Sequence, residues 1–112
     1  MTINRYLNSH NINYKAEYSF PNFSTEKGGK YRYDFAIFNN KNELLCLIEY
    51  QGDIHFKYHN SGWNNKEKFE ERQKSDIIKK EYCDNNNIKL YYITYEEDIE
   101  ERLEEILNDI RR

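Results

Sequence analysis

The stretch "YRYDFAIFNNKNELLCLIEYQGDIH" (residues 31–55) decides the fold and poses the first chemical question. Two apolar segments, 30–38 and 43–51, flank the polar residues "NNKN", which suit the connection of a β-hairpin. Each predicted strand carries an acid in its interior, Asp34 in the first and Glu49 in the second. A buried acid is costly without a partner. The pattern therefore predicts a hydrogen-bond donor, a basic side chain or a metal ion beside each of them.

The alternation of side chains along a strand places the two acids on one face of this hairpin. Asp34 shares its face with Arg32, and Glu49 shares its face with Gln51. Two pairing registers are open, one with the acids diagonal to each other and one with them directly opposite. Either register brings two carboxylates within reach of a shared cation, and a divalent metal ion is the economical choice, with Gln51 or the carbonyl of Tyr50 as a further ligand. For Asp34 alone, the alternative is a salt bridge to Arg32 or a lysine.

The rest of the chain predicts an α/β fold with a mixed sheet of about four strands and a C-terminal helix. In residues 12–20, Tyr14, Ala16, Tyr18 and Phe20 alternate with polar residues and are expected on one side of a strand. The last helix carries an apolar stripe beneath an acidic, solvated face. We predict one domain over residues 1–112 with the order α-β-β-β-α-β-α, from a helix over 2–10 capped by Thr2, strands over 12–20, 30–38 and 43–51, a helix over 66–83, a strand over 88–94 and a helix over 96–110.

The composition is that of a folded, soluble protein, with 38% hydrophobic and 33% charged residues. No apolar run approaches the ~20 residues that span a membrane, and the N-terminus lacks a secretory h-region. We therefore expect a cytoplasmic protein without a membrane partner, in which Cys46 and Cys83 are buried, reduced thiols. Asn, Lys, Ile and Tyr are abundant and have A/T-rich codons, which suits an AT-rich genome; for a phage or virus, the location would be the host cytoplasm.

The net charge of −3 argues against a generic nucleic-acid binder, but the charge is unevenly distributed. Acids concentrate in residues 96–112, so the remaining chain is weakly basic and compatible with DNA. The helix over 66–83 has two interpretations, a solvated stripe of ion pairs or a stripe that lines a site. In the second interpretation, the residues that contact nucleic acid are Lys66, Lys68, Arg72, Gln73, Lys74 and Lys80.

The segments "RYDFAI", "LLCLIEYQGDIHF", "FEERQKSDIIKKEYC" and "IKLYYITY" resemble small phage and bacterial nucleases of the PD-(D/E)XK superfamily. The nearest likeness is to the branch with very-short-patch repair endonucleases and related homing endonucleases, and it covers roughly residues 12–107. The resemblance implies a restriction-endonuclease-like α-β-β-β-α-β core. It also implies a Mg²⁺-dependent DNA endonuclease in which Mn²⁺ can substitute.

The resemblance also implies roles for individual residues. Asp34 and Glu49 are the metal-binding acids, Glu17 is a third candidate carboxylate, and His55 is a proton shuttle. The helix pattern of the family falls on Gln73, Asp76 and Lys79, where Lys79 (or Lys80) would stabilise charge on the phosphate. Gln51 stands where the family has a lysine, and its neutral amide can bind a metal but cannot act as a base.

The Gln51 substitution leaves other hypotheses open. One is a catalytically inactive module with the nuclease fold that binds nucleic acid or a protein partner. Another is an interaction protein with a tyrosine-rich surface, in which Asp34 and Glu49 only form salt bridges. The small size of the chain also favours a homodimer on DNA.

Overall fold

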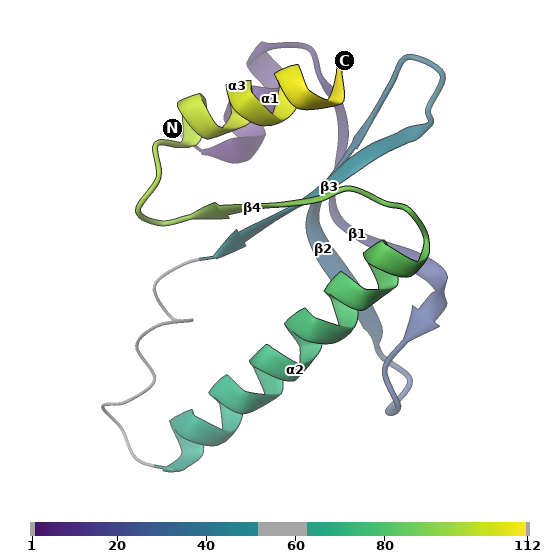
Figure 1. Cartoon of the computed structure of the whole chain (residues 1–112), viewed down its shortest axis with the longest axis vertical. Helices are drawn as coiled ribbons and strands as arrows, with labels where there is room; N and C mark the ends of the chain where they lie inside the picture. The colour runs from purple at the N-terminus through teal and green to yellow at the C-terminus, as the bar shows by residue number, and fades with distance from the viewer. Residues whose placement is uncertain (1, 52–62, 112) are drawn as a thin grey trace.

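The computed structural model describes residues 2–51 and 63–111, with the side chains of 63–69 outside the description. It confirms the predicted α/β class, the mixed four-stranded sheet and the order α-β-β-β-α-β-α (Figure 1). The elements are α1 (Ile3–Ser9), β1 (Asn13–Ser24), β2 (Lys30–Phe38), β3 (Leu44–Gln51), α2 (Trp63–Asn85), β4 (Leu90–Thr94) and α3 (Ile99–Ile110).

The sheet has the strand order β1-β2-β3-β4, and helices cover both of its faces (Figure 1). β1, β2 and β3 pair antiparallel, whereas β4 runs parallel to β3. A parallel pair needs a long crossover, and the segment containing α2 provides it. α2 lies on one side of the sheet, and α1 and α3 lie together on the other.

Two buried clusters hold the helices on the sheet. One cluster lies under α1 and α3 (the α1/α3 cluster), and the other lies under α2 (the α2 cluster). Side chains of β3 alternate between the two clusters: Cys46 and Ile48 belong to the α1/α3 cluster, and Leu47 belongs to the α2 cluster. The predicted stripe of α3 is confirmed, and so is the Thr2 cap of α1, whose side chain accepts a hydrogen bond from the Arg5 N–H. Cys46 and Cys83 are free and buried, as predicted.

The helix α2 is the longest element and is strongly polar. It begins three residues before the predicted boundary and spans 23 residues. Within the described part of the chain, no helix combines the length and the apolar character needed to cross a membrane.

The first strand differs most from the prediction, because β1 continues to Ser24 where a loop was expected after Phe20. Pro21 is tolerated there because β1 is an edge strand, and the pairing with β2 is irregular between Ser19 and Ser24. Phe23 accounts for the extension, since it is buried and stacks on Tyr82 of α2 with ring centroids 4.1 Å apart. Aromatic packing therefore prolongs a strand whose local sequence indicates a turn.

The predicted alternation of β1 is wrong, because the strand turns over at Glu17. Tyr14 packs against the α1/α3 cluster, whereas Tyr18 and Phe20 pack against the α2 cluster. Glu17 has a φ of 50°, a left-handed conformation that interrupts the regular strand. The neighbouring strand changes as well: Phe35 belongs to the α1/α3 cluster, but Tyr33 belongs to the α2 cluster.

Candidate active site

The paired residues of β2 and β3 follow the register in which the two predicted acids would lie opposite each other. Phe35 pairs with Ile48 and Ala36 with Leu47, so the same register, continued by one residue, sets Asp34 against Glu49. An irregularity between Ile37 and Phe38 shifts the pairing only at the other end of the hairpin. Of the two registers that the sequence allowed, Phe35, Ala36 and Ile37 follow the one that would set the acids opposite each other.

Asp34 is half-buried, and its partner is the backbone of β3. Its Oδ2 accepts a hydrogen bond of 2.7 Å from the N–H of Tyr50. The predicted alternative, a salt bridge from Asp34 to Arg32 or a lysine, does not occur among the described residues. The carboxylate therefore ties the end of β2 to β3.

Glu49 is paired with Lys79 of α2. The Lys79 ammonium forms an ion pair with Glu49 Oε1, and the side chains of Lys79 and Glu49 are only 11% and 13% exposed. Lys79 acts on this carboxylate both as a hydrogen-bond donor and through its charge. Of the two lysines predicted for this role, the structure brings Lys79 to the acid and leaves Lys80 exposed.

The pKa of Glu49 is raised from 4.5 to about 7, chiefly because burial removes water from the carboxylate. The adjacent Asp34 raises the pKa further, and the Lys79 ammonium opposes both effects. Glu49 thus sits where its negative charge is only partly compensated. Such a position is typical of functional carboxyl groups, although structural ion pairs produce it too.

These side chains line a polar cleft of about 260 Å³ between the sheet and α2. The α2 residues in its wall recur at helical spacing, which places them on one face of the helix. The lining residues are Arg32, Asp34, Glu49, Tyr50, Gln51, Arg72, Ser75, Asp76 and Lys79. Arg32 and Arg72 bring two guanidinium groups to the lining of the cleft.

Among the predicted site residues whose side chains the structure describes, the cleft contains most, but not all. Asp34, Glu49, Gln51, Arg72, Asp76 and Lys79 come together. Glu17 is exposed and does not line the cleft, and neither do the exposed Gln73, Lys74 and Lys80. His55 lies outside the described residues, as do the side chains of Lys66 and Lys68.

Three contributors were missed as site residues. Arg32 could have been found by its strand parity with Asp34, and Ser75 by its helical spacing from Arg72 and Lys79. Tyr33 contacts Lys79 from the buried side, and no spacing rule signals it, because regular alternation would direct it away from α2.

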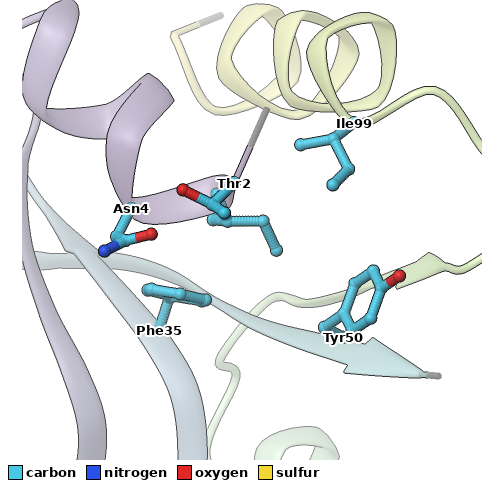
Figure 2. Close-up of a pocket in the computed structure, with 6 residues that line it drawn as sticks. Thr2, Asn4, Phe35, Tyr50 and Ile99 are labelled. Carbon is cyan, nitrogen blue, oxygen red and sulfur yellow. The ribbon is translucent and has the colours of Figure 1, made fainter.

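A second cavity, of about 330 Å³, lies on the opposite face of the sheet, under α1 and the start of α3 (Figure 2). Its lining is mainly apolar and comprises Thr2, Ile3, Asn4, Phe35, Tyr50 and Ile99. Figure 2 shows the Tyr50 side chain from β3 directed into this cavity. Tyr50 thus contributes to both faces, its side chain to the cavity and its N–H to Asp34.

The donor set of the cleft is compatible with Mg²⁺. Asp34, Glu49 and Gln51 offer carboxylate and amide oxygens, and Mg²⁺ is commonly held by one or two carboxylates with water completing the shell. In the described part of the chain, no three His, Cys, Asp or Glu side chains converge as a ready-made metal cluster. The partly compensated charge on Glu49 is the feature that a divalent cation would complement.

Comparison with known protein families, curated proteins and solved structures finds no match to this chain.

Proposed function

We propose that this protein is a divalent-metal-dependent endonuclease that hydrolyses phosphodiester bonds in DNA. One observation carries the proposal: two neighbouring carboxylates of the sheet and a buried lysine of α2 meet in a single polar cleft. This combination pairs oxygen ligands for a hard cation with a fixed positive charge for a phosphate. The resemblance of the motifs around Asp34, Glu49 and Lys79 to PD-(D/E)XK nucleases supports the same chemistry.

Each residue of the cleft has a role in this proposal. Asp34 and Glu49, with Gln51, would hold Mg²⁺ or Mn²⁺. The ion, when bound, would neutralise charge on the scissile phosphate and supply a water that is more acidic than bulk water. The Lys79 ammonium stabilises negative charge that develops on the phosphate oxygens. Lys79 comes from α2, so it supplies the positive charge that Gln51 lacks at the usual position.

Arg32 and Arg72 would bind phosphates of the DNA strand on either side of the scissile bond. They stand on opposite walls of the cleft, one on β2 and one on α2, and a guanidinium can donate two parallel hydrogen bonds to a phosphate. His55 as a proton shuttle and a homodimer on DNA both stay predictions.

The direct test is cleavage of plasmid and end-labelled oligonucleotide DNA. The wild-type protein should cut in Mg²⁺ or Mn²⁺ and should be inactive in EDTA. Retained DNA binding without cleavage in either metal would instead identify the inactive binding module. Absence of both binding and cleavage would favour the interaction protein, in which the two acids serve structure alone.

The two cleft arginines should dominate the salt dependence of DNA binding. Arg32→Ala and Arg72→Ala should each reduce the slope of log K against log [salt] by about 0.9 on duplex DNA, because each releases one phosphate contact. The measurement is fluorescence anisotropy over a salt series, in an Asp34→Asn background that prevents cleavage. Lys80→Ala is the matched control, since Lys80 is exposed on α2 but outside the cleft. Equal slopes for Arg72→Ala and Lys80→Ala would place the DNA elsewhere.

A further inference from the structure

Tyr33 is fully buried between β2 and α2, where it contacts Lys79 at two points. Its hydroxyl donates a hydrogen bond of 2.8 Å to the backbone carbonyl of Lys79. Its ring lies under the Lys79 ammonium, with Nζ 4.9 Å from the ring centroid. The Cys83 thiol, one turn further along α2, donates weakly to the same hydroxyl over 3.5 Å.

These contacts restrain both ends of the Lys79 side chain. A lysine has a flexible stem, and its compact ammonium does not orient itself as a guanidinium does. The Tyr33 hydroxyl fixes the helix backbone from which the stem starts, and the ring face favours the ammonium at the other end. Between these two restraints, Nζ is directed onto Glu49.

The break in strand alternation makes this arrangement possible. Tyr33 and Asp34 are successive residues, which in a regular strand would face opposite sides of the sheet. Here Tyr33 contacts α2, and Asp34 lines the cleft that α2 closes. Two successive residues of β2 therefore contribute to the same site: Tyr33 contacts Lys79, and Asp34 supplies one of the two carboxylates.

We propose that Tyr33 is a positioning residue of the active site, which holds the Lys79 ammonium at the cleft so that it meets the phosphate without rearrangement. The inference rests on the proposed function for its purpose, but the positioning itself can be measured without DNA. The hydroxyl of Tyr33, and not merely the bulk of its ring, keeps Lys79 in place.

The variant that tests this is Tyr33→Phe, which keeps the ring and removes only the hydroxyl. Tyr31→Phe is the matched control, because Tyr31 lies in the same strand and the same aromatic cluster but stacks on Phe23. A second control is Cys83→Ala, which removes the thiol and leaves the bond from Tyr33 to Lys79.

The first readout is the rate at which an acylating reagent labels Lys79, followed by mass spectrometry and normalised to the exposed neighbour Lys80. Tyr33→Phe should label Lys79 several-fold faster than wild type, because the ammonium leaves its shielded position on Glu49. Tyr31→Phe and Cys83→Ala should not change the ratio. An unchanged ratio in a folded Tyr33→Phe protein would overturn the proposal. If that variant does not fold, a rise in the ratio for Cys83→Ala as large as that expected of Tyr33→Phe would overturn it, because the thiol alone would then hold Lys79.

The second readout separates turnover from binding. Tyr33→Phe should lower kcat for DNA cleavage by at least about tenfold, since a misplacement of about 1 Å can cost 10²-fold. The Kd for DNA, measured in the Asp34→Asn background, should not change. Faster labelling of Lys79 together with an inactive wild type would support the positioning and refute the nuclease. An active wild type, with Tyr33→Phe equal to Tyr31→Phe in both readouts, would refute the positioning and keep the nuclease.

Discussion

Replacement of Lys79 by methionine is expected to destabilise the fold by about 3–5 kcal/mol at pH 8, because it leaves a buried carboxylate without its partner. Glu49 is 13% exposed and pairs with Lys79. Lys80→Met is the matched control: it removes the same charge from the next, exposed position of α2 and should change stability by no more than about 0.5 kcal/mol. Urea unfolding of both variants measures the difference.

The cost of Lys79→Met should fall as the pH is lowered. The pKa of Glu49 is about 7 in the folded protein against 4.5 for the unperturbed group, so between these values the folded state binds more protons than the unfolded state. The stability that this proton contributes is complete below pH 4.5 and is lost as the pH rises through 7. Loss of Lys79 raises the pKa further, so at pH 5 Glu49 is protonated and the variant loses little.

The double variant Glu49→Gln/Lys79→Met completes a double-mutant cycle for the pair of Glu49 and Lys79. It replaces both charges by neutral groups of similar size, and such replacements are often neutral or stabilising. Its stability should therefore lie near that of the wild type and vary less between pH 5 and pH 8. A Lys79→Met variant that matches Lys80→Met, or that costs the same at both pH values, would show that the ion pair contributes little.

Asp34→Asn should abolish both DNA cleavage and the response of the protein to metal. We expect cleavage to fall by about a thousandfold, the upper end of the range for loss of one charge-stabilising group. The fold should persist, because the asparagine oxygen can accept the Tyr50 N–H as Asp34 does. Cleavage assays in Mg²⁺ and Mn²⁺ measure the first effect.

Thermal melts without DNA measure the second effect. In the wild type, metal at one hundred times its Kd should stabilise the fold by about 2.7 kcal/mol. For a domain of this size, that corresponds to a rise in Tm of about 10 °C or more. Asp34→Asn should show no such rise in Mn²⁺ relative to EDTA.

Glu17→Gln is the control for the metal experiment. The sequence offered Glu17 as a third carboxylate, but the structure has it exposed and outside the cleft, so this variant should keep both the rise in Tm and the cleavage. A wild type that melts at the same temperature with and without metal, together with an Asp34→Asn variant that melts several degrees lower, would mean that Asp34 is purely structural.

The parts of the fold that follow local rules could be predicted from the sequence. The hairpin and its two acids were predictable because period-two patterns and a polar turn determine them. The α3 stripe follows in the same way from helical periodicity. The helix face that carries Lys79 was predictable only in part, since Lys79 and Lys80 remained alternatives until packing selected Lys79.

The rest depends on contacts between distant segments. Phe23 extends β1 because it stacks on Tyr82, which lies 59 positions further along the chain. Glu17 adopts a left-handed conformation that a glutamate rarely favours, so no propensity rule anticipates it. Tyr33 reaches Lys79 because the alternation of β2 is broken next to Asp34, and no spacing rule predicts that break.

The two terminal helices and the cleft lie on opposite sides of the sheet, which matters when the protein is fused to another molecule. Every described residue that lines the cleft comes from β2, β3 or α2, whereas the first and last helices, α1 and α3, pack together on the far side of the sheet (Figure 1). A domain, tag or surface anchor fused at either terminus would therefore extend from the side of the sheet opposite to the cleft. Immobilised or tethered forms of this protein should retain full access to a polymer as long as DNA.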